Sequence, residues 1–269
     1  MRLELKESFN LIISADCGQA FRFKTDEKGN TVGVAGNKAF KGRVENGFLI
    51  TETPETDDEF WKNYFDLNSS YLKMNESILK RGDETVKKAI TLAEGLHIFN
   101  QEPFETLISF IISQNNNIPR IRGIIERLCE LYGEEIGEGL HSFPTPEALK
   151  GITAEELSPL KAGFRAKYIA DAVRCVNEGK IKLEGLKTKS FEEAKEELKT
   201  VKGIGDKVAS CVLLFGFHKL EAFPVDVWIK RTMESLYGDL DYSRFGEYPG
   251  LAQQYLFYYS RYLQSIKEN

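Results

Sequence analysis

The chain has 269 residues, of which 42% are hydrophobic, and its formal net charge is −5. This length and composition allow a sizeable buried core in one large domain or two modest ones. No apolar run is long enough to cross a membrane and no secretory leader is evident, so we expect an intracellular protein without a membrane partner.

The chain has β character up to about residue 60. Runs rich in β-branched and aromatic residues alternate with polar turns, which predicts an antiparallel sheet. The expected strands cover residues 9–14, 20–24, 31–35, 39–44 and 48–53, with a polar turn at 26–30.

From about residue 57 onward the pattern is helical, because apolar residues recur at three- and four-residue spacing. The expected helices include residues 104–112, 121–131, 166–176 and 251–263, and Ser190 caps another over 190–198. We therefore predict an α+β fold with two domains. Residues 1–90 form a small N-terminal antiparallel sheet domain with flanking helices, and residues 91–269 form a predominantly helical domain. The helices between about 57 and 79 are compatible with either one.

Four cysteines lie far apart along the chain and form no Cys-x-x-Cys pair. This spacing argues against a metal or iron–sulfur site and favours reduced thiols. We expect neither a metal nor a cofactor. The cysteines are Cys17, Cys129, Cys175 and Cys211.

The most informative segment, residues 201–207, reads Val-Lys-Gly-Ile-Gly-Asp-Lys. Gly203 and Gly205 allow positive φ and a close approach of backbone N–H groups to an anion, and a helix is expected directly behind them. Phosphate is the expected ligand of this hairpin. On the helix, about residues 206–215, Lys207 and Cys211 share one side with apolar neighbours. Loss of hydration there favours a neutral amine, which is a usable nucleophile.

Asp226 follows Pro224 and precedes a helical run, so it is predicted to be an N-cap carboxylate kept ionised by the helix dipole. Taken one at a time, these features have ordinary interpretations: turn glycines, an exposed lysine and a simple helix cap. In combination, Gly-Ile-Gly-Asp-Lys-Val-Ala at 203–209 and Pro-Val-Asp at 224–226 resemble the helix-hairpin-helix, Gly/Pro-Asp signature of the DNA base-excision glycosylases. The resemblance implies that Lys207, which marks bifunctional members, and Asp226, the essential carboxylate, are the catalytic residues.

Further segments narrow the resemblance to one branch, the 8-oxoguanine DNA glycosylase/AP lyases. They are Gly-Gln-Ala-Phe-Arg at 18–22, Ser-Gln-Asn-Asn-Asn-Ile-Pro-Arg at 113–120, Gly-Phe-Arg-Ala-Lys-Tyr at 163–168 and Leu-Ala-Gln-Gln-Tyr-Leu-Phe at 251–257. These segments follow the family's order and, with the hairpin, extend from about residue 16 to about residue 257.

The resemblance also assigns roles in reading the damaged base. Gln253 addresses the pairing edge of an extruded base, and Phe257 stacks on it with Cys211 on the other side. The carbonyl of Gly18 accepts the N7–H that 8-oxoguanine has and guanine lacks. The ordinary interpretations are that Phe257 belongs to a core stripe and that Gly18 only permits a turn.

On the opposite strand, the resemblance implies that Asn115, Arg120 and Arg165 hold the orphaned cytosine and that Phe164 is the wedge that fills the gap. Without the resemblance these are a helix-capping asparagine, solvated arginines and a core phenylalanine. Trp228 departs from the histidine of some relatives, so its contact with the DNA backbone is an open expectation.

The acidic total charge counts against a DNA partner, but basic residues gather around the suspected motifs. They include Lys161, Arg165 and Lys167, and then Lys199, Lys202 and Lys207. The leading hypothesis is a monomeric, bifunctional DNA glycosylase/AP lyase that excises 8-oxoguanine, preferably opposite cytosine, from double-stranded DNA through a lysine Schiff base. The alternatives are a non-enzymatic helix-hairpin-helix DNA-binding module and a glycosylase for a different damaged base.

Overall fold

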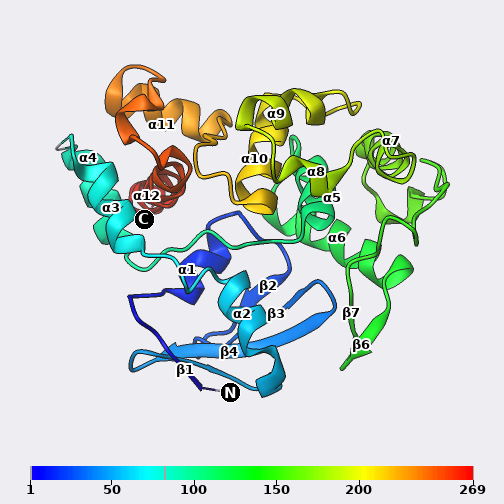
Figure 1. Ribbon diagram of the computed structural model, residues 1–269, viewed down its shortest axis with the longest axis horizontal. Helices are drawn as coiled ribbons and strands as arrows, with labels where there is room; N and C mark the ends of the chain where they lie inside the picture. Colours follow the sequence, from blue (N-terminus) through cyan, green and yellow to red (C-terminus); the bar gives the residue numbers. More distant parts are fainter. Residues whose placement is uncertain (1, 82, 269) are drawn as a thin grey trace.

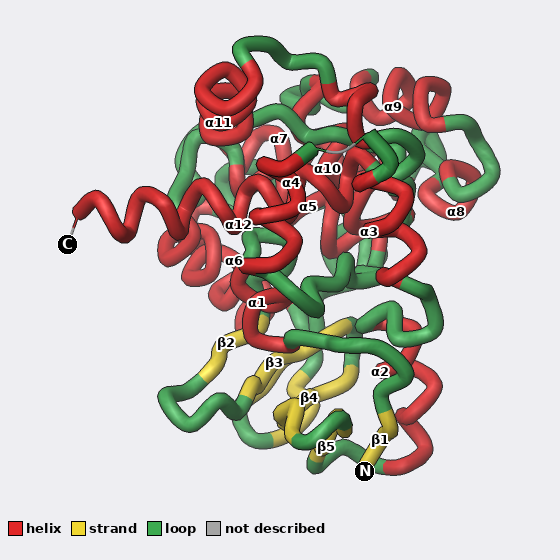
Figure 2. Tube along the Cα trace, turned by 90° about the vertical axis from the view of Figure 1, so that its left-hand side faces the viewer, coloured by secondary structure: helices red, strands yellow, loops and turns green. Residues whose placement is uncertain are grey.

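An antiparallel sheet occupies one end of the molecule and most helices lie above it, as a computed structural model describes for residues 2–81 and 83–268 (Figures 1 and 2). Its five strands run in the order β1-β5-β4-β3-β2. They are β1 (Arg2–Glu4), β2 (Phe23–Thr25), β3 (Thr31–Ala35), β4 (Lys38–Glu45) and β5 (Phe48–Thr51). The predicted α+β class, with an N-terminal antiparallel sheet, is confirmed.

The predicted strand at residues 9–14 is wrong. This segment contains α1 (Leu11–Asp16), which begins because the side chain of Asn10 accepts a hydrogen bond from the backbone N–H of Ile13 at 3.1 Å. The cap outweighs the β-branched composition of the short run. The first strand is instead β1, which pairs with β5 and which the sequence pattern did not indicate. The other predicted strands overlap β2 to β5, and the turn at 26–30 joins β2 to β3.

The helical part contains most of the remaining residues. Its helices are α2 (Asp58–Tyr64), α3 (Tyr71–Leu79), α4 (Glu84–Leu92), α5 (Pro103–Ser113), α6 (Ile118–Tyr132), α7 (Arg165–Asn177), α8 (Leu183–Leu186), α9 (Phe191–Lys199), α10 (Asp206–Phe217), α11 (Val227–Tyr237) and α12 (Pro249–Glu268). Short 3₁₀ turns lie at Glu55–Asp57, Ser158–Leu160 and Tyr242–Phe245, and a small hairpin pairs β6 (Glu135–Gly137) with β7 (Leu140–His141). The predicted helices are present. In the part of the chain that the structure describes, none is both long and apolar enough for a membrane span.

Two clusters of buried side chains form the core. An aromatic cluster packs between the sheet and α2, and it includes Phe23, Phe40, Trp61 and Phe65. Side chains from α3 and α4 instead join the larger cluster of the helical part. The helices between residues 57 and 92 are therefore shared between the two clusters. The domain division at residue 90 stays a prediction.

The buried side chain of Gln19 joins the sheet end to the helical end. Its amide nitrogen donates to the carbonyls of Ser14 and His97, both at 2.8 Å, and its amide oxygen accepts from the backbone N–H of Phe99 at 2.8 Å. Each polar atom of this buried amide therefore has a partner, which is the condition for burying it at low cost. The network fixes the position of Gly18, the preceding residue.

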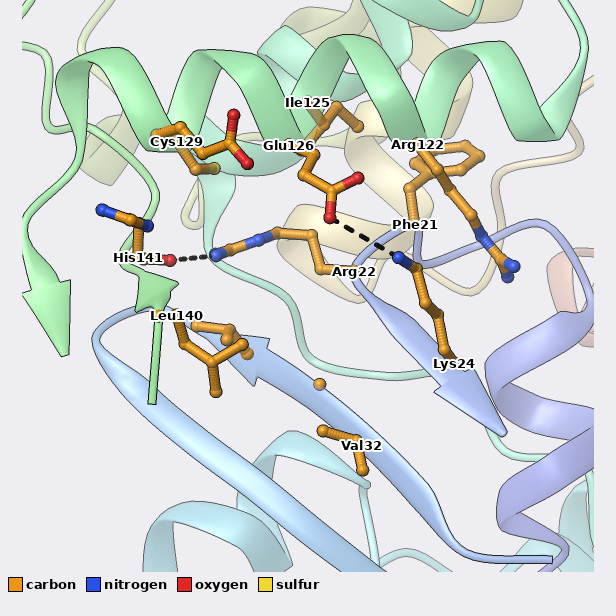
Figure 3. A pocket seen from close by; sticks show the side chains of 14 residues that line it. Phe21, Arg22, Lys24, Val32, Arg122, Ile125, Glu126, Cys129, Leu140 and His141 are labelled. Carbon is orange, nitrogen blue, oxygen red and sulfur yellow. Dashed lines mark hydrogen bonds and ion pairs between the residues drawn. The ribbon is translucent and has the colours of Figure 1, made fainter. Parts of the chain in front are cut away.

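A cavity of about 160 Å³ lies beside this junction, between β2, β3, α6 and the β6–β7 hairpin. Figure 3 shows Arg22 reaching across it to donate to the carbonyl of His141, and Lys24 forming an ion pair with Glu126 at 3.6 Å. The contact of Arg22 ties the sheet end to the β6–β7 hairpin, and that of Lys24 ties it to α6, whose first residues border the candidate site.

Candidate active site

In the hairpin between α9 and α10, one of the two glycines has the positive φ that the sequence allows and the other does not. Gly203 has φ +87°, and a Cβ there would lie 2.4 Å from the ring of Tyr168, so only glycine fits. Gly205 is extended, with φ −103° and ψ −176°, and its expected positive φ is wrong. Nothing lies within 4 Å of a Cβ built at Gly205, and it caps α10 without a side chain. Open space therefore adjoins the start of α10, where the first N–H groups of a helix lack partners within the helix, as an anion site requires.

Lys207 is the second residue of α10 and points across to α5. Its Nζ donates to Oγ of Ser113 at 3.4 Å and lies 5.3 Å from the ring centroid of Phe110. The side chain is half-buried. The amine thus lies over an aromatic ring, and its hydrogen bond to Ser113 is long and weak, which leaves it available to a substrate.

Asp226 caps α11, as its sequence position predicts. Its Oδ1 accepts from the backbone N–H of Ile229 at 2.8 Å. Among the described residues, the carboxylate makes no other hydrogen bond. Lys207 and Asp226 both line a small inner pocket of about 60 Å³ and also the outer cleft, of about 540 Å³, next to it. Both proposed catalytic residues therefore border the inner pocket and the cleft next to it.

The four residues expected to read the damaged base all line the inner pocket: Gly18, Cys211, Gln253 and Phe257. Gly18 has φ +79°, and a Cβ there would lie 3.3 Å from a ring carbon of Phe257. The backbone conformation therefore favours glycine, and any larger side chain would also press on the Phe257 ring. No described residue donates a hydrogen bond to the Gly18 carbonyl, so this oxygen is free to accept one.

The polar groups of the pocket are already ordered. The Gln253 amide donates to the carbonyl of Pro224 at 3.3 Å and accepts from Gln254 at 2.7 Å. Burial raises the pKa of Cys211, which keeps it a neutral thiol. Burial likewise raises the pKa of Cys17, which also lines the pocket, to about 12.

Several lining residues were missed in the sequence: Cys17, Phe110, Ser113 and Gln254. Phe110 and Ser113 lie at i and i+3 at the end of α5, immediately before the asparagine run. This spacing places both on one helix face, and it was a usable signal.

The asparagine run has divided roles. Asn117 caps α6 by accepting from the N–H of Arg120 at 3.0 Å, and Asn116 donates to the carbonyl of Ile112 at 3.1 Å. Asn115 is exposed, has φ +47° and, among the described residues, makes no side-chain hydrogen bond. Two asparagines therefore shape the loop, and the third presents a free amide.

Arg165 is held inside the protein. It is 2% exposed, and its guanidinium donates to the carbonyls of Gln114, Asn115 and Ala162, at 2.7 Å to Asn115. Arg120 is exposed and donates to the carbonyl of Lys161 at 3.3 Å. Arg165 thus fixes the loop that carries Asn115, whereas Arg120 is accessible. The contact of either arginine with cytosine stays a prediction.

Phe164 projects from the turn before α7 and is 52% exposed. Its ring packs edge-on against Tyr168, with centroids 5.8 Å apart, and Tyr168 in turn packs against Gly203 of the hairpin. Trp228, on the first turn of α11, is 43% exposed and lines the outer cleft with Lys207. Among the described residues expected to hold DNA, Trp228 alone lines the outer cleft, and none lines the inner pocket.

Comparisons with known proteins agree with this arrangement. The family model described as the 8-oxoguanine DNA glycosylase N-terminal domain matches residues 2–107, and that of the HhH-GPD superfamily of base excision DNA repair proteins matches residues 108–243. The chain therefore belongs to the HhH-GPD superfamily, and it carries the N-terminal domain of its 8-oxoguanine DNA glycosylase branch.

Individual relatives support the same branch. A probable N-glycosylase/DNA lyase of Methanothermobacter thermautotrophicus is 31% identical over 66% of this chain and 68% of its own. The N-glycosylase/DNA lyase of Saccharomyces cerevisiae is 40% identical over 54% of this chain, which spans only 42% of that relative. The Clostridium acetobutylicum 8-oxoguanine glycosylase/lyase, solved with double-stranded DNA containing cytosine opposite 8-oxoguanine, superimposes with a TM-score of 0.89 at 38% identity over 98% of both chains.

Proposed function

We propose that this protein is a bifunctional DNA glycosylase/AP lyase that excises 8-oxoguanine, preferably opposite cytosine, from double-stranded DNA inside the cell, and that it acts as a monomer. The observation that carries the proposal is that Lys207 and Asp226 line one pocket together with Gly18, Gln253 and Phe257. The full-length match to a solved 8-oxoguanine glycosylase/lyase favours this activity over a non-enzymatic DNA-binding module.

In the proposed reaction, the damaged nucleotide is extruded into the inner pocket. The amine of Lys207 bonds to C1′ as the N-glycosidic bond breaks, and the base leaves with that bonding pair and a proton. The free oxygen of the Asp226 carboxylate stabilises the positive charge that develops on the sugar. The C1′–O4′ bond of the sugar then breaks, O4′ takes the bonding pair and a proton, and C1′ becomes a Schiff base with Lys207. The Schiff base acidifies the C2′ protons, so β-elimination can release the 3′ phosphate.

Recognition of the lesion rests on the free carbonyl of Gly18, which accepts the N7–H of 8-oxoguanine. Guanine presents a lone pair there, and an unpaired group in a dry pocket costs about 1–3 kcal/mol. Phe257 stacks on the base, Cys211 lies on its other side, and Gln253 bonds its pairing edge. Since the Gln253 amide is already ordered, little entropy is lost when the base enters.

The DNA itself is held around the cleft. The backbone at Gly203 and Gly205 binds a phosphate at the start of α10, and Trp228 contacts the strand beside it. Phe164 fills the gap in the stack. Asn115, on the loop that Arg165 supports, and Arg120, on the first turn of α6, bond the orphaned cytosine.

Borohydride trapping with an 8-oxoguanine duplex tests the proposal. We expect a covalent adduct with the wild-type protein and with the control Lys230→Gln, whose lysine is exposed and paired with Glu234. Lys207→Gln should give none. An undiminished adduct in Lys207→Gln rejects the mechanism. Duplexes with other oxidised or alkylated bases test the substrate, and faster release of any of them rejects 8-oxoguanine as the preferred lesion.

A further inference from the structure

A groove of about 510 Å³ runs along the outer side of α7, away from the inner pocket. Its floor is apolar and is formed by Ile152, Ala170 and Val173. Lysines border it on three elements: Lys150 before the turn at Gly151, Lys167 on α7 and Lys202 in the hairpin. Neither catalysis nor base recognition, as proposed above, uses these lysines.

The charge of this α7 groove is positive although the chain is acidic overall. Arg174 forms ion pairs with Asp171 at 2.6 Å and with Glu178 at 2.7 Å, so both carboxylates of the groove already have a cationic partner. The three lysines are exposed, and none of them forms an ion pair within residues 2–81 and 83–268. Four cations and two carboxylates leave a net charge of +2, against −5 for the whole chain.

The groove is continuous with the elements that hold DNA in the proposed function. Lys202 directly precedes Gly203, and its backbone N–H donates to Asp171 of α7 at 2.9 Å, which fixes the hairpin against the groove wall. Lys167 lies on the first turn of α7, directly after the turn that carries Phe164. A DNA strand bound at the hairpin would therefore lie beside a cationic surface.

We propose that the α7 groove binds the phosphodiester backbone of the duplex that flanks the lesion. This inference rests on the proposed function, because it extends the same DNA complex. Flexible lysines on an apolar floor make sequence-independent contacts with phosphate and read no base. The groove therefore supplies salt-dependent affinity to a protein whose total charge opposes DNA binding.

The salt dependence of binding tests the inference. The variant Lys150→Gln/Lys167→Gln/Lys202→Gln is compared with the control Lys73→Gln/Lys80→Gln/Lys88→Gln. The control lysines are also exposed and, in the described part of the chain, unpaired. They lie on or beside α3 and α4, at the opposite end of the molecule from α7 (Figure 1). Affinity for the lesion duplex is measured between low and physiological salt for each protein.

Each lost phosphate contact lowers the slope of log K against log salt by about 0.9. We expect a slope smaller by about 2–3 in the groove variant, an affinity about tenfold to a hundredfold weaker at physiological salt, and no change in the control. Equal slopes in the two variants overturn the inference. Base release by the wild-type protein is measured on the same duplex. Its absence rejects the proposed function, whereas base release combined with equal slopes rejects the groove alone.

Discussion

The two sides of the proposed DNA site are built differently. The lesion side draws on the loop after α1, α10, the start of α11 and α12, and its side chains are buried or half-buried around one pocket. The partner-strand side presents Asn115 on the loop before α6, Arg120 on the first turn of α6 and Phe164 in the turn before α7, and all three are exposed. The lesion side is therefore assembled before DNA arrives, as catalysis requires, whereas the partner-strand side is completed by the DNA it holds.

The largest effect is expected from removing one charge on the lesion side. Asp226→Asn keeps an oxygen that can accept from Ile229, so the cap and the fold should survive. The charge that stabilises the developing cation is lost, and we expect single-turnover base release to slow by about a thousandfold. Asp226→Ala adds a loss of about 1 kcal/mol in stability. Wild-type rates in Asp226→Asn would show that the carboxylate only caps the helix.

The second prediction concerns the one buried arginine of the partner-strand side. Arg165→Met leaves the carbonyls of Gln114, Asn115 and Ala162 without their donor, so the free energy of unfolding should fall by about 3 kcal/mol. Arg120→Met should change it by less than about 0.5 kcal/mol. Urea unfolding measures both. If the two variants are equally stable, Arg165 is not a support of the loop and the contrast between the two sides is weaker.

The third prediction concerns the effect of low pH on His97, a buried residue that supports the lesion side. Gln19, which anchors Gly18, donates to the carbonyl of His97. Burial lowers the pKa of His97 from its usual 6.5 to about 4. Between these values the unfolded chain binds a proton at His97 that the folded protein does not, so the contribution of His97 to stability falls as the pH drops from 6.5 to 4, by on the order of 3 kcal/mol. Below about pH 4 this loss is complete.

Denaturant unfolding across that range measures the effect. In His97→Gln, the slope of unfolding free energy against pH should be smaller by about 1.4 kcal/mol per pH unit, which is the contribution of one proton. A slope equal to that of the wild type would mean that His97 does not titrate differently in the two states.

The smallest effect is expected at the exposed arginine. Arg120→Ala should slow base release opposite cytosine by about tenfold and leave the other opposite bases nearly unchanged, because one fork of hydrogen bonds to the base is lost. Release rates from duplexes with each of the four opposite bases measure this preference. If Arg120→Ala keeps its preference for cytosine, then Asn115 and not Arg120 recognises the opposite base.

Local signals in the sequence predicted much of this molecule. The capped helix at Ser190, the hairpin, the cap at Asp226 and strand β3 follow from residues within a few positions of one another. The resemblance to the 8-oxoguanine glycosylases supplied residues that the fold does bring together in one pocket.

Features that depend on distant contacts could not be predicted. Strand β1 has three residues and exists because β5 pairs with it. The contact of Lys207 with Ser113 joins residues 94 positions apart. Burial of Arg165 results from carbonyls about 50 positions earlier, which no residue pattern encodes. Side-chain type indicates what chemistry is available, but packing decides whether a group faces a substrate or supports a loop.

The ring of Tyr168 lies between Gly203 and Phe164, and it packs so closely on Gly203 that no Cβ fits there. A side chain larger than hydrogen at position 203 would displace this ring and disturb its contact with Phe164. The proposed strand-binding hairpin and the proposed wedge therefore share one aromatic side chain as a common support.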